Sequence, residues 1–359
     1  MRIAVLEFLS GGGLMQPVAS GTNQLSGASQ LSGLYAEGLA MLTGLATDLV
    51  RCDHQVFTCL DPTAFADPTS LSVRDRASIC IEIASTDWID TWTAISLKCD
   101  RTIVIAPELD NQLERIVGML RSHGTDVLAS TAEFLSATSD KLRTSQLLLA
   151  AGVAHPVTTL LGEHLRFLEE DEQMLNENSP LTLKRRDGAG CLDMRFFPNN
   201  RLLKEWHETS GQALLGHSDD WIVQPWLEGQ PASMAILAGS DWRVLGAVEQ
   251  RIRLSPIDKT NRCAEASVSA VEFLGCKALT HRIEDGQLNE FATRVKNALP
   301  EGGAGWIGID FLIPTDNAAA MELVAIEINP RLTTSYLEYR DRYGAVLADE
   351  LVQPTGRDL

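Results

Sequence analysis

Two apolar segments near the end of the chain, residues 306–313 and 322–331, constrain the fold more than any other feature. Both segments are rich in β-branched residues, and the polar residues between them are typical of a turn. We therefore predict that they pair as an antiparallel hairpin, with the turn centred near residues 318 and 319.

This register places Asp310 opposite Glu327, with Asn329 on the same face of the sheet. Two carboxylates and an amide are ligands expected for a Mg²⁺ ion that keeps waters and phosphate oxygens in its other positions. An edge or solvent-facing role for Asp310 is the alternative. An unpaired carboxylate inside an apolar strand is costly, which favours a metal site for all three residues, with Mn²⁺ as a substitute.

Composition excludes several classes of protein. The 359 residues carry a formal charge of −18, which argues against a general nucleic-acid binder, because such a protein shows a basic patch. The seven cysteines contain no CxxC pair, which indicates reduced thiols and a cytoplasmic location. Residues 1–6 form an apolar run too short for a signal peptide or a membrane span, so we expect a first β-strand and no membrane association.

The first third of the chain alternates strand and helix patterns. Strands are predicted at residues 1–6, 55–60 and 101–106, with a helix at 34–50, which indicates a small parallel sheet with covering helices. In such sheets the ligand lies at the carboxyl ends of the strands, where Glu108 and the glycines at 11–13 fall. A mobile loop is the alternative for these glycines, which lack the GxGxxG spacing.

Lys184 ends an apolar strand directly before a Gly-Ala-Gly loop. Backbone N–H groups in such a loop can bind phosphates while a fixed ammonium group neutralises them. The spacing differs from a Walker A loop. A solvated basic cluster with Arg185 and Arg186 is the alternative.

Taken in order, five elements resemble the ATP-grasp superfamily over about residues 130–340: Asp140-Lys141, Lys184 before residues 187–190, residues 224–229, Asp310, and Glu327 with Asn329. The resemblance implies an ATP-grasp fold, α/β and α+β, with an N-terminal Rossmann-like (pre-ATP-grasp) domain. The implied domains are an N-terminal domain at 1–125, a central subdomain at 126–228, and a C-terminal subdomain with the metal site at 229–359.

The resemblance also implies the role of each site residue. Lys141 and Lys184 would contact the ATP phosphates, and one or two Mg²⁺ ions would be held by Asp310, Glu327 and Asn329. The loop that would close over the phosphates comprises Asp187, Gly188, Ala189 and Gly190. The segment that would reach the adenine comprises Gln224, Pro225, Trp226 and Leu227. Many members carry a ribose-binding glutamate shortly afterwards, but here a proline lies near that position, so Glu228 is the candidate replacement.

Further segments are similar to the tyramine–glutamate ligase group of methanofuran biosynthesis and its bacterial relatives. They are residues 7–13, 36–41, 106–108 and 327–336. This resemblance implies glutamate, or a glutamate-terminated compound, as the acyl donor. The acceptor would be an amine such as tyramine, tyrosine or another amino acid.

The implied reaction forms an acyl phosphate from a carboxylate and ATP, after which an amine displaces phosphate to give an amide. Arg331 is the candidate for stabilising the acyl phosphate, with a surface ion pair as the alternative. Arg251 and Arg253, two apart on one strand, could bind a substrate carboxylate by bidentate hydrogen bonds, or could lie on a solvated sheet face.

Two other functions stay open at this point. One is a peptide or amino-acid ligase of another pathway, and the other is a nucleotide-binding regulator without turnover. The expected partners are a small-molecule carboxylate and an amine, and a homodimer is an open alternative to a monomer.

Overall fold

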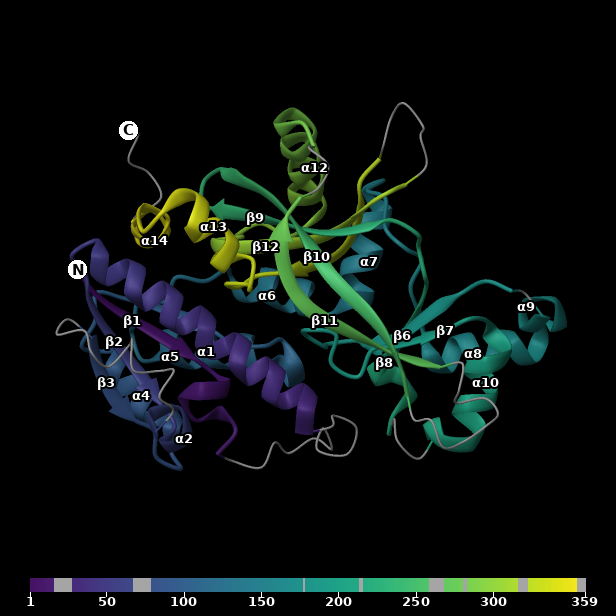
Figure 1. The fold of residues 1–359 in the computed structure, drawn as a ribbon, viewed down its shortest axis with the longest axis horizontal. Helices are drawn as coiled ribbons and strands as arrows, with labels where there is room; N and C mark the ends of the chain where they lie inside the picture. The colour runs from purple at the N-terminus through teal and green to yellow at the C-terminus, as the bar shows by residue number, and fades with distance from the viewer. Residues whose placement is uncertain are drawn as a thin grey trace.

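The computed structural model describes residues 1–15, 28–66, 79–176, 178–212, 216–257, 268–279, 283–315 and 322–353. The predicted turn near residues 318 and 319 lies outside these ranges, as does Cys263. The described chain forms two β-sheets that lie side by side, with helices around and between them (Figure 1). None of the described helices has the length and apolar character needed to cross a membrane.

The N-terminal sheet has four parallel strands in the order β3-β2-β1-β4. Its strands are β1 (Arg2–Glu7), β2 (Gln55–Leu60), β3 (Ile79–Ile83) and β4 (Arg101–Ile105). Its helices are α1 (Ala28–Arg51), α2 (Pro62–Ala66), α4 (Trp88–Ser96) and α5 (Gln112–Ser122). The predicted small parallel sheet is therefore confirmed, with β3 as a strand that the sequence did not reveal. Parallel pairing brings the ends of β1 and β4 to one edge of the sheet.

The larger sheet has nine strands in the order β13-β12-β9-β10-β11-β7-β6-β8-β5, and neighbouring strands in it are antiparallel. One half comprises β5 (Thr159–Leu160), β6 (Leu181–Arg185), β7 (Arg195–Phe197) and β8 (Trp221–Pro225). The other half comprises β9 (Gln230–Ala238), β10 (Trp242–Pro256), β11 (Ser269–Ala278), β12 (Gly305–Ile313) and β13 (Val324–Asn329). The long strands β10 and β11 cross the middle of the molecule in Figure 1 and join the two halves.

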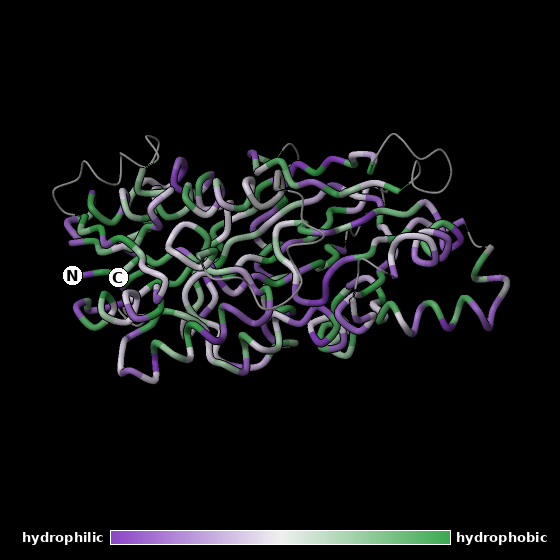
Figure 2. Tube along the Cα trace, turned by 90° about the horizontal axis from the view of Figure 1, so that it is seen from below, coloured by the Kyte–Doolittle hydropathy of each residue, from purple (hydrophilic) through white to green (hydrophobic). Residues whose placement is uncertain are grey.

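Helices pack on the large sheet through apolar faces, and hydrophobic and hydrophilic residues alternate along the helices in Figure 2. The helices that share a core with β9, β12 and β13 are α6 (Ala132–Ser139), α7 (Lys141–Ala150) and α12 (Asp285–Ala298). Helix α8 (Leu161–Glu170) packs on β8 and α10 (Asn200–Trp206) on β7, and α9 (Glu172–Asn176) contacts these two helices. Near the end of the chain follow α13 (Tyr336–Tyr343) and α14 (Val346–Val352).

Helix α1 packs against both sheets. Its buried residues Leu42, Leu45 and Leu49 belong to the same hydrophobic core as Trp306 and Tyr336 of the C-terminal segment. The two sheets therefore share one core, and the ends of β1 and β4 are held next to the large sheet.

Candidate active site

The first lysine of the site, Lys141, begins helix α7. Asp140 caps this helix, because its carboxylate accepts hydrogen bonds from the backbone N–H groups of Leu142 and Arg143 at 3.0 and 3.2 Å. Arg186 donates two further bonds to the same carboxylate, at 2.8 and 2.6 Å. The Asp140 side chain is thus engaged by the backbone and by Arg186, and it fixes where Lys141 enters the site.

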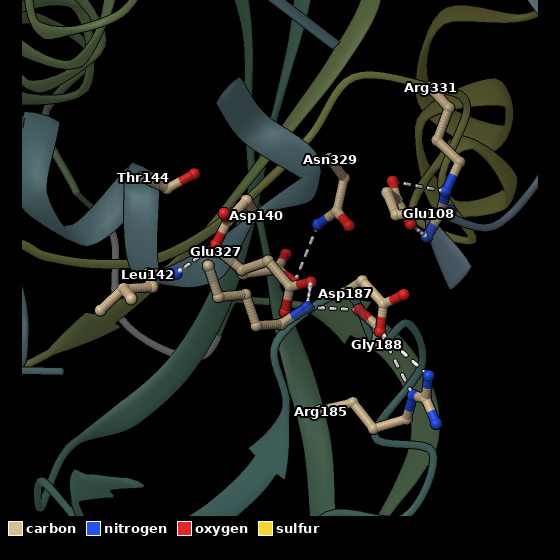
Figure 3. Close-up of polar contacts among 12 residues, drawn as sticks. Glu108, Asp140, Leu142, Thr144, Arg185, Asp187, Gly188, Glu327, Asn329 and Arg331 are labelled. Carbon is tan, nitrogen blue, oxygen red and sulfur yellow. Dashed lines mark hydrogen bonds and ion pairs between the residues drawn. The ribbon is translucent and has the colours of Figure 1, made fainter. Parts of the chain in front are cut away.

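The predicted register of β12 and β13 is confirmed. Asp310 pairs with Glu327, and the Asn329 amide donates to the Asp310 carboxylate at 3.1 Å. Lys141 Nζ lies 2.8 Å from Glu327 Oε1 and also contacts the carbonyl oxygen of Gly188 (Figure 3). The three candidate metal ligands and one candidate phosphate-binding lysine therefore meet in one place.

Burial and mutual charge shift the pKa values in this cluster. Burial lowers the pKa of Lys184 to about 8, although the nearby Glu327 opposes the shift. Burial and the charge of Glu327 raise the pKa of Asp310 to about 6. Burial alone would raise the pKa of Glu327, but Lys141 and Lys184 reverse the effect and hold it below its usual range. Glu327 is thus the carboxylate of the pair that keeps its charge to the lower pH.

The donor set fits a hard cation. Within the described ranges, no three His, Cys, Asp or Glu side chains come close enough together to hold a metal ion. Two carboxylates with an amide oxygen remain, which suits a Mg²⁺ ion that takes its other ligands from phosphates and water. The Asp310 side chain is hydrogen-bonded by the side chains of Ser233, its register partner on β9, and of Gln250 on β10. Neither residue could be found from the sequence, because finding them requires knowing that β9 lies between β12 and β10.

The glycine loop contacts the N-terminal part of the chain. The Asp187 carboxylate accepts from the backbone N–H of Asp110 at 2.8 Å and does not line the cavity, whereas Gly188, Ala189 and Gly190 do. Gly190 has φ +62°, and a Cβ there would lie 2.5 Å from the side chain of Leu34 on α1. Only glycine fits this approach without strain.

The segment predicted to reach adenine lies at the end of β8. The Gln224 amide donates to Thr158 Oγ1 at 2.7 Å. Trp226 packs edge-on against Phe196, with ring centroids 5.1 Å apart. The cavity in this region is lined by Gln224, Pro225, Trp226, Leu227, Glu228 and Pro231. Apolar and aromatic side chains with few polar groups suit a flat heterocycle.

Arg331 is largely buried, with 12 % of its side chain exposed, and is paired with Glu108. Its Nε and Nη2 atoms donate to the two Glu108 carboxylate oxygens, each at 2.9 Å (Figure 3). Glu108 follows β4 in the N-terminal part and is only 2 % exposed. This pair is therefore not a surface ion pair, which was the alternative for Arg331.

Arg251 and Arg253 lie away from the cavity, and their predicted role needs correction. Both are exposed on β10, whereas the neighbouring Gln250 and Ile252 line the cavity. Arg251 donates to the carbonyl of Leu274 at 2.6 Å. Arg253 forms an ion pair with Glu272. The spacing placed the two arginines on one face but could not tell which face meets the ligand.

The site is one cavity of about 320 Å³, lined by both sheets and by α1. The profile of the ATP-grasp domain matches residues 138–335, which is more than half of the chain, and that of the pre ATP-grasp 3 domain matches residues 54–133. The chain belongs to the ATP-grasp family. The predicted ATP-grasp fold with an N-terminal pre-ATP-grasp domain is therefore confirmed.

Solved structures share the fold of this ATP-grasp protein at low sequence identity. An ATP-grasp superfamily protein from Archaeoglobus fulgidus is 19% identical, with a TM-score of 0.62 and 100% of this chain and 90% of that chain covered. D-alanine–D-alanine ligase from Bacillus anthracis is 14% identical, with a TM-score of 0.60 and coverage of 98% and 96%. N5-carboxyaminoimidazole synthetase from Staphylococcus aureus, complexed with ADP, is 15% identical, with a TM-score of 0.58 and coverage of 93% and 71%. No curated protein sequence matches the chain.

Proposed function

We propose that the protein is an ATP-dependent ligase that joins a carboxylate to an amine through an acyl phosphate, releasing ADP and phosphate. The observation that carries this proposal is the meeting of Lys141, Lys184 and Glu327 with Asp310 and Asn329 in one cavity. Phosphoryl transfer requires positioning and charge stabilisation more than covalent catalysis, and these residues can supply both.

ATP would bind with its phosphates against the two lysines and the loop at 188–190, and with its adenine against residues 224–227. Glu228 is the candidate for the ribose, since it lines the same part of the cavity. Asp310, Glu327 and Asn329 would hold Mg²⁺ or Mn²⁺. The metal, when bound, would neutralise charge on the phosphate oxygens.

Arg331 would stabilise the acyl phosphate. Its guanidinium group is held by Glu108 on one side, and its charge acts on Glu327 on the other. A buried arginine with a fixed orientation costs little reorganisation when negative charge develops nearby.

The narrower substrate assignment is glutamate as donor and an amine such as tyramine as acceptor, in the biosynthesis of a methanofuran-type C1 carrier. It is supported by the similarity of residues 7–13, 36–41, 106–108 and 327–336 to that ligase group. Arg251 and Arg253 no longer support it, because both lie outside the cavity. A ligase of another pathway remains the second candidate, since the nucleotide and metal residues would be the same.

A screen for ADP release tests the proposed function. Purified protein with ATP and Mg²⁺ would be given carboxylates, including glutamate, in combination with aryl amines and amino acids. We expect ADP release that requires both a carboxylate and an amine. ATP binding without any substrate-dependent ADP release would indicate a regulator. Release with other carboxylates but never with glutamyl compounds would remove the glutamate assignment alone.

The cellular location is part of the same proposal. The cysteines within the described ranges are all free, which is consistent with reduced thiols and a cytoplasmic protein. Small molecules would be its only substrates, and the net charge of −18 disfavours nucleic acid.

A further inference from the structure

The cavity continues beyond the phosphate and metal residues into the N-terminal part of the molecule. There it is lined by apolar side chains from the end of β1, from α1 and from the segment after β4, among them Phe8, Leu9, Leu34, Met41 and Pro107. Two carboxylates interrupt this apolar wall, Glu7 and Glu37, while Glu108 lies next to it, bonded to the lining residue Arg331. We call the part of the cavity around these carboxylates the acidic chamber.

Glu7 is fixed in the chamber. Its carboxylate is 2 % exposed and accepts bonds from the backbone N–H groups of Leu9 and Ser10 at 3.0 and 2.7 Å, and from Ser10 Oγ at 2.6 Å. Helix α1 has a glycine where it faces this carboxylate, and a Cβ on Gly38 would lie 2.5 Å from Glu7 Oε1. Burial raises the pKa of Glu7 to about 6, although the three hydrogen bonds oppose the shift. From the sequence, Glu7 belongs only to the segment 7–13 of the narrower resemblance, without a role of its own.

The Glu37 carboxylate, unlike that of Glu7, accepts no hydrogen bond from a described residue. Glu37 precedes Gly38 on α1 and lines the cavity, and it has no ion pair with any described residue. Burial raises its pKa to about 7, against the opposing charge of Arg331. A carboxylate held in this way can take up and release a proton near neutral pH.

Among the residues that the structure describes, the chamber has more anions than cations. Of the cations that line the cavity, Lys141 and Lys184 act on Glu327, and Arg185 lies 3.6 and 3.2 Å from Asp110 and Asp187. Among the described cations, Arg331 is the one whose charge acts on Glu7 and Glu37, and it is already bound by Glu108. Within the described ranges, Glu7 and Glu37 therefore have no ion pair with a cation of their own. Excess negative charge next to apolar side chains suits an ammonium group on an apolar body and disfavours an anionic ligand.

We propose that the acidic chamber binds the ammonium group of the acceptor amine and that Glu37 removes its proton. The inference rests on the proposed function and assigns the acceptor site within it. The ammonium group gives one proton to the Glu37 carboxylate. The nitrogen lone pair then forms the C–N bond, the bond from the acyl carbon to the phosphate oxygen breaks, and phosphate leaves with that electron pair and the second proton.

A comparison of two nucleophiles tests this assignment. Hydroxylamine is neutral at pH 7.5 and traps acyl phosphates as hydroxamates, so it needs neither an ammonium site nor a base. Primary amines from methylamine to phenethylamine are protonated at this pH and need both. In Glu37→Gln, we expect the ratio of the amide rate to the hydroxamate rate to fall at least about a hundredfold. Glu169→Gln, an exposed glutamate on α8, serves as the control and should leave the ratio unchanged.

A binding measurement on the unaltered protein keeps the test independent of how the variant folds. With Mg²⁺ and ADP present, we expect phenethylamine to raise the melting temperature more than 3-phenylpropanoate, which has a similar apolar body and the opposite charge. Equal or greater stabilisation by the carboxylate would overturn the assignment, as would an unchanged rate ratio in Glu37→Gln. Hydroxamate formation without turnover of any amine would overturn it too. If no carboxylate yields a hydroxamate, the proposed function itself fails, because no acyl phosphate forms.

Discussion

Glu327 interacts electrostatically with three charged residues of the site: Lys141, Lys184 and Asp310. It lies opposite Asp310 and contacts Lys141, and its charge opposes the lowering of the Lys184 pKa by burial. Removal of its charge would leave two lysines near each other with only Asp310 to compensate. The same residue is the candidate ligand able to bridge two metal ions.

We therefore expect Glu327→Gln to lower turnover at least about a hundredfold, equivalent to roughly 2.7 kcal/mol of barrier. The volume is retained, so the loss should come from charge. The free protein should melt at a lower temperature, since the lysines lose their anion, and ATP with Mg²⁺ should stabilise it weakly or not at all. Turnover and thermal shifts at saturating Mg²⁺ check these points, and near-normal turnover would remove the metal site.

Glu37 predicts a pH dependence of stability that does not depend on any reaction. Its pKa is about 7 in the folded protein against its usual value of 4.5, so the folded state binds the proton more tightly. The stability it contributes is present below pH 4.5 and is lost as the pH rises through 7. Glu37→Gln should thus be more stable than the parent at pH 8, by on the order of 2 kcal/mol because the side chain is partly exposed.

Denaturant unfolding of both proteins from pH 4 to pH 8 measures this difference. It should shrink to nothing below pH 4.5, while Glu169→Gln should differ little from the parent at any pH. If the difference in free energy of unfolding between the two proteins is the same at every pH, burial does not raise the pKa of Glu37.

At the scale of elements, α1 combines two glycines with opposite surroundings. Gly33 has open space where a Cβ would lie, whereas Gly38 faces the Glu7 carboxylate. Alanine is favoured over glycine inside a helix by about 1 kcal/mol. Gly38 therefore lowers the intrinsic stability of the helix, and the absence of a Cβ there allows the Glu7 carboxylate to contact the helix.

We expect Gly33→Ala to raise the free energy of unfolding by up to about 1 kcal/mol and Gly38→Ala to lower it. Both changes add one methyl group to the same helix, so their difference reports the contact with Glu7. Equilibrium unfolding measures both, and equal effects would place Glu7 away from α1.

Several elements could be predicted from the sequence because the evidence for them is local. The position of the turn is enough to put Asp310 opposite Glu327, although a bulge shifts the register between Asp310 and Phe311, and a lysine before a glycine loop marks β6. Which face of a strand meets the cavity depends on distant parts of the chain. The spacing of Arg251 and Arg253 therefore could not show that both side chains lie on the face away from the cavity. Glu108 and Arg331 are 223 residues apart, so no spacing could have revealed their pairing.

At the scale of the whole molecule, α1 ties the beginning of the chain to its end. The buried Asp48 carboxylate accepts from the hydroxyl of Tyr336 at 2.8 Å and from two nitrogens of Arg340 at 2.7 Å. These contacts lie beside the core that both sheets share. The expected domain limits at residues 125 and 228 remain predictions, because this shared core crosses the first of them.

Asp48→Asn should destabilise the protein by about 2–3 kcal/mol, since a neutral amide leaves the Arg340 charge without its buried partner. We expect one urea transition at a lower midpoint, because the shared core couples the two sheets. Asp341→Asn, an exposed acid one residue away from Arg340, provides the control. Two separate transitions, or an unchanged midpoint, would contradict this account of α1.

The position of α1 also has a consequence for synthesis on the ribosome. The helix is made long before Tyr336, which completes its packing and is 288 residues from Asp48. The part of its leucine face that packs near Trp306 and Tyr336 stays uncovered until those residues are made, and uncovered apolar surface is open to aggregation. The nascent chain therefore presents this part of the helix to chaperones until the segment with Tyr336 emerges and covers it.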